Sequence, residues 1–282
     1  MYRIGFSTPC AITEDMFKGY SEAGIRHMEV SVGKEHCDTM DFSLLKKWSD
    51  KYGVALYSFH LPFWPFGEID ISSKSLCDKT VEYFAEFIKK GSEIGIDKYI
   101  IHPSGEPIDE GDREERMACA KKSLDTLAKI AKKYDSVICV ENLPRTCLGR
   151  DSKDIMELLS ANGDLRACFD TNHLLSESAA DFIKNVGDKI VTAHISDYDF
   201  KNERHWLPGE GDIDWHEMQE LFKGINYDGA WLYEINLGAP DTITRPRDLC
   251  YGDFVKNALE LFEGKKLTVI GKRKNNLKFW NE

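Results

Sequence analysis

The chain alternates short apolar segments with longer amphipathic segments along almost its whole length. The short segments are rich in β-branched and aromatic residues, which is typical of buried strands. The longer segments repeat apolar residues at helical spacing, and this alternation favours βα units with a parallel sheet. We expect eight strands, at residues 3–7, 27–31, 55–60, 98–102, 136–141, 167–170, 190–195 and 230–235.

The helical patterns are clearest at residues 80–94, 113–134 and 153–160. Glycine follows a helical pattern just before the next expected strand at four places, where a left-handed residue commonly ends a helix. These four glycines are Gly24, Gly53, Gly95 and Gly163. No polar linker or low-complexity tract divides the chain, so we expect one domain.

Eight parallel strands suit either a closed barrel or a doubly wound open sheet. An open sheet concentrates its ligands at one switch point, often with a glycine-rich phosphate loop after the first strand, and the segment GFSTPC is not such a loop. We therefore predict an α/β fold, a single (β/α)₈ TIM barrel over residues 1–264. The locally basic segment 265–282 is predicted to be a C-terminal extension that packs Phe279 or Trp280 on the barrel.

The overall charge restricts the possible partners. Acidic residues outnumber basic ones, 48 to 37, and a formal net charge of -11 disfavours binding to nucleic acid. The sequence contains neither a stretch of about 18 apolar residues nor a basic leader followed by an apolar one, so we expect a cytoplasmic protein without a membrane segment. Its eight cysteines form no CxxC pair, which predicts reduced core thiols. The chain is also a candidate homo-oligomer.

Six of the expected strands end in a side chain that can bind a metal, namely His60, His102, Glu141, Asp170, His194 and Glu234. A closed barrel brings the carboxyl ends of its strands to one rim, so these side chains are expected to converge. Three carboxylates and one imidazole (Glu141, Asp170, His194 and Glu234) form an oxygen-dominated set that suits Mn²⁺, Mg²⁺ or Co²⁺. Taken singly, each residue is equally compatible with a helix cap or a hydrogen-bonded histidine.

Several strings at these strand ends resemble a known family: VENLP (140–144), FDTNH (169–173), AHISD (193–197), RHWLPGEGDIDW (204–215) and LYEI (232–235). In this order they are similar to the xylose isomerase-like barrel superfamily, which includes sugar isomerases and epimerases, relatives of tagatose 3-epimerase, and endonuclease IV. The resemblance extends from the first strand to the last helix.

The resemblance implies that Glu141, Asp170, His194 and Glu234 bind one divalent metal, with Mn²⁺ preferred over Mg²⁺, Co²⁺ and Zn²⁺. It also implies that His173 and Arg204 lie at the substrate. The implied activity is that of a metal-dependent isomerase or epimerase that acts on a keto sugar or a polyol-derived ketone. Glu141 and Glu234 would remove and return a carbon-bound proton, through an enediolate.

Endonuclease IV is the rival interpretation, because that enzyme uses further histidines to bind three zinc ions. This chain offers His60, His102 and His173 together with Glu203 and His205 as candidate extra metal ligands. The net charge and the absence of basic strand-end loops favour the isomerase over such a phosphodiesterase. A sugar-binding barrel without catalysis is the third alternative.

The loop LPFWPFGEID after His60 carries three aromatic residues between prolines, and we expect Trp64 and its neighbours Phe63 and Phe66 to cover a sugar ring or pack on another surface. We interpret His60 and His102 as partners of substrate hydroxyls.

Two further positions are candidate substrate contacts. Gly209 and Gly211 follow the seventh strand, where barrels often bind phosphate, but the flanking Glu210 and Asp212 favour a neutral sugar or a sugar acid. Glu29 ends the second strand and suits either a substrate hydroxyl or a helix cap.

Overall fold

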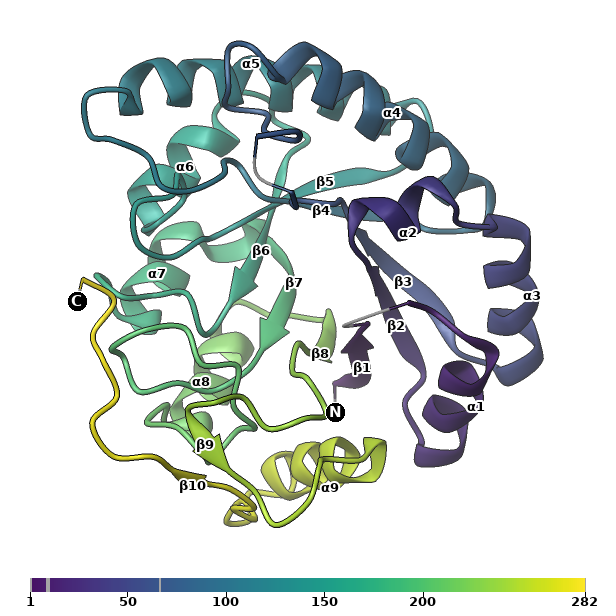
Figure 1. The fold of residues 1–282 in the computed structure, drawn as a ribbon, viewed down its shortest axis with the longest axis vertical. Helices are drawn as coiled ribbons and strands as arrows, with labels where there is room; N and C mark the ends of the chain where they lie inside the picture. The colour runs from purple at the N-terminus through teal and green to yellow at the C-terminus, as the bar shows by residue number, and fades with distance from the viewer. Residues whose placement is uncertain (1, 9–10, 66, 282) are drawn as a thin grey trace.

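Eight parallel strands form a closed barrel in the order β1 to β8, with β8 pairing back onto β1 (Figure 1). The computed structural model describes residues 2–8, 11–65 and 67–281. The predicted (β/α)₈ barrel is confirmed. Its strands are β1 (Arg3–Ser7), β2 (His27–Ser31), β3 (Ala55–His60), β4 (Lys98–Ile101), β5 (Val137–Glu141), β6 (Arg166–Asp170), β7 (Ile190–Ile195) and β8 (Ala230–Tyr233).

Helices surround the barrel, as Figure 1 shows. They are α1 (Glu14–Ala23), α2 (Lys34–Asp38), α3 (Phe42–Tyr52), α4 (Cys77–Glu93), α5 (Arg113–Lys132), α6 (Ser152–Leu159), α7 (Ala179–Val186), α8 (Trp215–Gly224) and α9 (Tyr251–Phe262), with a 3₁₀ turn at Gly187–Lys189. Within the described part of the chain, none of these helices combines the length and the apolar character needed to span a membrane.

Three of the four predicted glycine helix ends are left-handed. Gly24, Gly53 and Gly95 have φ angles of 96°, 64° and 94°. The prediction for Gly163 is wrong, because α6 has already ended at Leu159 and its cap, Ser160, keeps a right-handed conformation. The chain then continues through further tight turns, and no left-handed residue is needed at the glycine.

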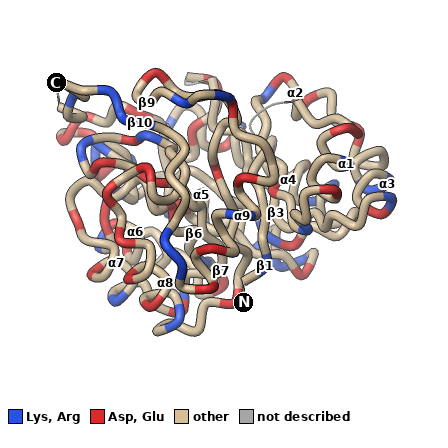
Figure 2. The backbone as a smooth tube through the Cα atoms, turned by 90° about the horizontal axis from the view of Figure 1, so that it is seen from below, with Lys and Arg blue, Asp and Glu red and all other residues tan. Residues whose placement is uncertain are grey.

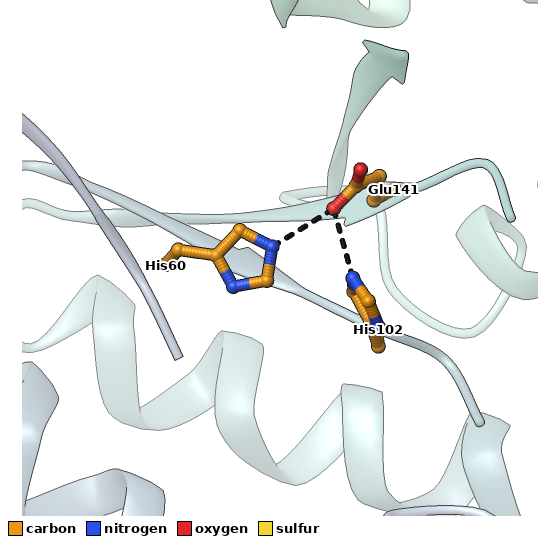
Figure 3. Close-up of side chains that lie close together, drawn as sticks. All are labelled: His60, His102 and Glu141. Atoms are coloured by element: carbon orange, nitrogen blue, oxygen red, sulfur yellow. Dashed lines mark hydrogen bonds and ion pairs between the residues drawn. The ribbon is translucent and has the colours of Figure 1, made fainter. Parts of the chain in front are cut away.

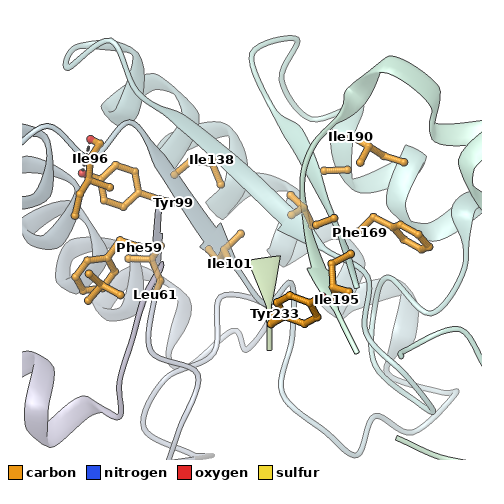
Figure 4. Close-up of a cluster of buried hydrophobic side chains, with 14 of the residues drawn as sticks. Phe59, Leu61, Ile96, Tyr99, Ile101, Ile138, Phe169, Ile190, Ile195 and Tyr233 are labelled. Atoms are coloured by element: carbon orange, nitrogen blue, oxygen red, sulfur yellow. Dashed lines mark hydrogen bonds between the residues drawn. The ribbon is translucent and has the colours of Figure 1, made fainter. Parts of the chain in front are cut away.

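The main core lies between the barrel and its helices. Side chains that point outward from the strands, such as Phe59, Tyr99, Ile138 and Phe169, are buried there (Figure 4). Because successive residues of a strand point to opposite faces, the residues between them point into the barrel. Polar residues occupy these inward positions near the carboxyl ends of the strands.

The tail lies against the loops that follow β7 and β8. Two short strands, β9 (Ile243–Thr244) and β10 (Lys272–Arg273), pair in an antiparallel manner, and the sequence had not indicated them. Two of the basic residues of the tail, Lys272 and Arg273, form β10 itself, and Figure 2 shows basic positions near the labels of β9 and β10. Phe279 and Trp280 remain 49% and 42% exposed, whereas the partly buried Leu267 and Ile270 pack on the core. The division of the chain at residue 264 stays a prediction.

Candidate functional site

Four side chains from the ends of four neighbouring strands meet at one point. Glu141, Asp170, His194 and Glu234 each present a ligand atom within 4.8 Å of the others. His194 Nδ1 lies 3.0 Å from Glu141 Oε1, 3.2 Å from Glu234 Oε2 and 3.7 Å from Asp170 Oδ2. β4 and β8 end one residue earlier than His102 and Glu234, so these two side chains start the following loops.

Asp170 provides the test of whether this group suits a cation. Its Oδ1 accepts the Asn172 N–H at 2.6 Å, whereas its buried Oδ2 accepts no hydrogen bond from any residue that the structure describes. Burial raises the pKa of Asp170 to about 7, and the nearby Glu234 and Glu141 act in the same direction. A buried carboxylate oxygen without a partner, beside an imidazole and two more carboxylates, fits a divalent metal.

A second group shares Glu141. Its Oε2 lies 3.0 Å from His60 Nε2 and 3.3 Å from His102 Nε2 (Figure 3). Burial opposes the charge of Glu141, but His194 and His102 hold its pKa well below the usual range. His60 Nδ1 faces the carbonyl of Leu61 at 2.9 Å, so both ring nitrogens of His60 face acceptors.

A third group contains His173, Glu203 and His205. Glu203 Oε1 lies 3.3 Å from His173 Nε2 and 3.2 Å from His205 Nε2. Although burial favours the neutral acid, the two histidines lower the pKa of Glu203. Its other oxygen, Oε2, lies 2.5 Å from a guanidinium nitrogen of Arg145, a residue that the sequence had not singled out. Arg145 also binds both carboxylate oxygens of Glu106, at 2.6 and 2.9 Å.

A cavity of about 300 Å³ opens above these groups, and residues at or after the carboxyl ends of all eight strands line it. The lining residues are Ser7, Thr8, Ser31, Val32, Gly33, Phe63, Trp64, His102, Glu141, His173, Glu203, His205, Glu234, Ile235 and Asn236. Phe63 stacks on His102 with ring centroids 4.2 Å apart, and Trp64 is 57% exposed at the rim. Phe66 lies outside the described residues.

Two predicted substrate contacts do not line this cavity. His60 is buried with 1% exposure and contacts Glu141 from below the lining residues. The Arg204 guanidinium binds Asp199 Oδ1 at 3.0 Å and the carbonyl oxygen of Lys278 at 2.8 Å. The sequence alone did not indicate that the tail would provide a partner for Arg204.

The glycine-rich loop after β7 is organised by a carboxylate. Asp197 Oδ2 accepts the backbone N–H groups of Gly209 and Gly211 at 2.8 and 2.9 Å, and the indole N–H of Trp215 at 2.8 Å. From the sequence, these two glycine amides were candidates for binding phosphate, but in the structure both already donate to Asp197.

The architecture and the polar strand ends together define a (β/α)₈ barrel with a candidate site at its carboxyl rim. Residues 17–248 match the family model described as xylose isomerase-like TIM barrel, and the chain belongs to this family. The metal and substrate roles of individual residues stay predictions.

Two curated proteins are similar in sequence. An uncharacterized protein of Methanocaldococcus jannaschii is 26% identical over 214 residues, which is 71% of each chain. A D-psicose 3-epimerase of Enterocloster bolteae is 27% identical over 132 residues, covering 44% of this chain and 41% of the relative.

Solved structures share the fold. A D-tagatose 3-epimerase-like protein superposes with a TM-score of 0.79 at 22% identity, over 93% of this chain and 97% of the other. D-psicose 3-epimerase from Clostridium cellulolyticum H10, solved with D-tagatose, has a TM-score of 0.70 at 17% identity, over 85% and 87% of the two chains. A 3-keto-D-glucoside 4-epimerase from E. coli has a TM-score of 0.69 at 18% identity, over 86% and 94%.

Proposed function

We propose that this protein is a divalent-metal-dependent isomerase or epimerase that transfers a proton on a keto sugar or a polyol-derived ketone. The observation that carries the proposal is the position of two carboxylates. Glu141 Oε1 and Glu234 Oε2 lie within 3.2 Å of the same atom, His194 Nδ1, and both residues line the cavity. The epimerase relatives in sequence and structure support the same class of reaction.

A divalent cation held by Glu141, Asp170, His194 and Glu234, with Mn²⁺ the preferred ion, would act as a Lewis acid that makes a proton next to a carbonyl more acidic. The protein supplies the base. Burial opposes the charge of Glu234, but His194 lowers its pKa, and Glu141 is likewise kept ionised. Both residues are therefore carboxylates near neutral pH and can accept a proton.

Two carboxylates on opposite sides of one substrate carbon allow either outcome of proton transfer. One of them removes the proton, and the other takes up a proton from solvent water and returns it to the opposite face. Return to the same carbon gives an epimer, and return to the neighbouring carbon gives an aldose or ketose isomer. His173 and His102 line the cavity beside Glu141, where ring N–H groups can hold substrate hydroxyls.

The cavity favours a small, uncharged polyol. Phe63 and Trp64 form one wall, and aromatic faces of this kind cover the apolar face of a sugar ring and exclude water. The acidic side chains Glu141, Glu203 and Glu234 would repel a phosphate group.

Deuterium exchange tests the proposal. Incubation of ketoses and inososes with the Mn²⁺-loaded protein in heavy water should introduce deuterium at carbon, and Glu141→Gln and Glu234→Gln should each abolish this incorporation. Glu115→Gln, at an exposed helix position, is the control and should exchange normally. Full incorporation by either site variant would contradict the roles assigned to the two glutamates.

The two additional groups of metal-capable side chains favour a second candidate, a zinc-dependent phosphodiesterase similar to endonuclease IV. His60 and His102 share Glu141 with the four-residue group, and His173, Glu203 and His205 form a group of their own. Several metals held close together suit displacement at phosphorus.

Metal analysis separates the two functions. About one Mn²⁺ or similar ion per purified chain supports the isomerase, whereas three zinc ions per chain together with cleavage of duplex DNA at abasic sites would establish the phosphodiesterase. Tight sugar binding without exchange or cleavage would instead indicate a barrel that only binds its ligand.

A further inference from the structure

Glu29 is a buried carboxylate beneath the candidate metal group, and the proposed chemistry does not use it. It belongs to β2 and has no exposed surface. Its Oε1 accepts the hydroxyl of Ser7 at 3.0 Å, and its Oε2 accepts the hydroxyl of Ser58 at 2.7 Å. Burying a carboxylate costs several kcal/mol unless charge and hydrogen bonds compensate it, so this position calls for an explanation.

The strand register places Glu29 between its two serines. Ser7 on β1 and Ser58 on β3 are the residues directly opposite Glu29 on the neighbouring strands. The pairing of β2 with β3 is irregular between Met28 and Glu29, and an irregularity of this kind redirects the side chain that follows it. The carboxylate thus points into the barrel, toward β7 on the opposite wall.

His194 of β7 meets Glu29 there. Its Nε2 lies 2.9 Å from Glu29 Oε1, although this nitrogen makes no regular hydrogen bond with the described residues. The opposite ring nitrogen, Nδ1, faces Glu141, Asp170 and Glu234. One side of the imidazole therefore contacts a buried anion while the other faces the ligand group.

We propose that Glu29 is a positioning residue whose carboxylate, 2.9 Å from Nε2, favours the proton of His194 on that nitrogen and leaves the Nδ1 lone pair to bind the divalent cation. A neutral imidazole carries a proton on only one nitrogen, so an acceptor at Nε2 selects the form that binds metal through Nδ1. The buried negative charge also makes the ring a stronger donor to a cation. This inference rests on the metal centre of the proposed function, but not on its reaction.

Metal binding without substrate tests the inference. Free Mn²⁺ is measured by electron paramagnetic resonance during titration of wild type, Glu29→Gln and Ser58→Ala. Glu29→Gln preserves the shape of the side chain and removes its charge, and we expect it to weaken Mn²⁺ binding roughly 10- to 100-fold, as loss of outer-sphere partners does at other metal sites. Ser58→Ala removes a hydrogen bond to Glu29 Oε2, the oxygen that does not face His194, and leaves the charge of Glu29 in place. It should therefore change the Mn²⁺ affinity less than about 3-fold.

A measurement on the wild type covers the case in which Glu29→Gln fails to fold. In protein labelled with ¹⁵N-histidine and loaded with Zn²⁺, the ring of His194 should carry its proton on Nε2 and bind the metal through Nδ1. The assignment would be overturned if the metal bound to Nε2, or if the wild type bound no divalent ion. It would also be overturned if folded Glu29→Gln kept the wild-type Mn²⁺ affinity, or if Ser58→Ala weakened Mn²⁺ binding as much as Glu29→Gln does. Absence of deuterium exchange in a wild type that binds Mn²⁺ would contradict the proposed function only.

Discussion

Asp170 and His194 are direct partners on β6 and β7, and Asp170 Oδ2 lies 3.7 Å from His194 Nδ1. Among the described residues this oxygen has no hydrogen-bond partner, and burial raises the pKa of the Asp170 carboxyl to about 7. In an unfolded chain an aspartate titrates near about 3.9. Between these two values the folded protein therefore holds a proton that the unfolded chain has released.

This difference predicts how stability depends on pH in the metal-free protein. Because the folded state binds more protons, the free energy of unfolding falls as the pH rises from about 4 to about 7. His173, whose pKa is raised to about 10 by Asp170 and Glu203 against burial, acts in the same direction at higher pH. Urea unfolding in EDTA at pH 5.5 and 7.5 should show this decrease in the free energy of unfolding. In Asp170→Asn the difference between the two pH values should be smaller.

Added Mn²⁺ should reverse the trend, because in the proposed site the cation would bind the Asp170 carboxylate and would bind it more tightly once the proton has left. The increase in melting temperature on adding Mn²⁺ should therefore be larger at pH 7.5 than at pH 5.5. An identical pH dependence of wild type and Asp170→Asn in EDTA would contradict the role given to this residue.

Gly211 lies where a side chain has no room. A Cβ atom at this position would overlap the carboxylate of Asp197 and the carbonyl oxygen of Tyr198. Since Asp197 also holds the amides of Gly209 and Gly211, the loop cannot yield without losing several hydrogen bonds. We expect Gly211→Ala to lower the free energy of unfolding by about 3 kcal/mol, the upper end of the usual cost of overpacking.

Gly111→Ala is the matched control for this change. None of the described residues lies within 4 Å of a Cβ built at Gly111, so the free energy of unfolding of this variant should stay within about 0.5 kcal/mol of wild type. Replacing glycine by alanine also lowers the conformational entropy of the unfolded chain, which slightly favours the folded state. Equal stability of the two variants would show that the loop after β7 is more adaptable than its contacts indicate.

The sequence predicted the barrel and the convergence of the four strand-end side chains for a local reason, whereas the metal role of these side chains stays a prediction. Strands buried on both faces give continuous apolar runs, and the first polar residue after each run marks the strand end within one or two positions. Once the strands are known to be parallel, the closure of the barrel brings Glu141, Asp170 and His194 together without further information.

Contacts between loops were not predictable in the same way. Glu106, Arg145 and Glu203 follow three different strands, and no periodicity connects them. The pairing of β9 with β10 involves only two residues on each strand, which is too short for a pattern. Glu29, which was expected at the end of the second strand, lies in the middle of β2, and its direction depends on an irregularity of strand pairing that sequence does not reveal.

Arg273 connects the tail to the glycine-rich loop. Its guanidinium donates to the carbonyl oxygens of Glu210 and Gly211 and to the carboxylate of Asp212. Arg273→Ala should lower the free energy of unfolding by about 1 to 2 kcal/mol, since hydrogen bonds that involve a charged group are worth about that much when partly exposed. Lys266→Ala, an exposed change in the same tail, should have little effect in the same urea titration. If both changes lowered the free energy of unfolding equally, the tail would stabilise the protein through its positive charge and not through the hydrogen bonds of Arg273.

Arg145 joins three loops through one guanidinium. It binds Glu106 with two hydrogen bonds and Glu203 with an ion pair of 2.5 Å, while Glu203 faces His173 and His205 with its other oxygen. All three charged side chains are about a quarter exposed, so water screens their attraction only in part. Arg145→Gln should therefore lower the free energy of unfolding by about 2 kcal/mol, within the range for charged hydrogen bonds that lose a partner.

A double-mutant cycle isolates the contact between Arg145 and Glu106. Glu106→Gln alone leaves Arg145 paired with Glu203, so it should lower the free energy of unfolding less than Arg145→Gln does. If the two residues act as a pair, the double variant should be more stable than the sum of the single effects implies, by about 1 to 2 kcal/mol. Strict additivity in urea unfolding would mean that Arg145 acts through Glu203 alone, and the loop after β4 would then contribute nothing to holding His173, Glu203 and His205 in place.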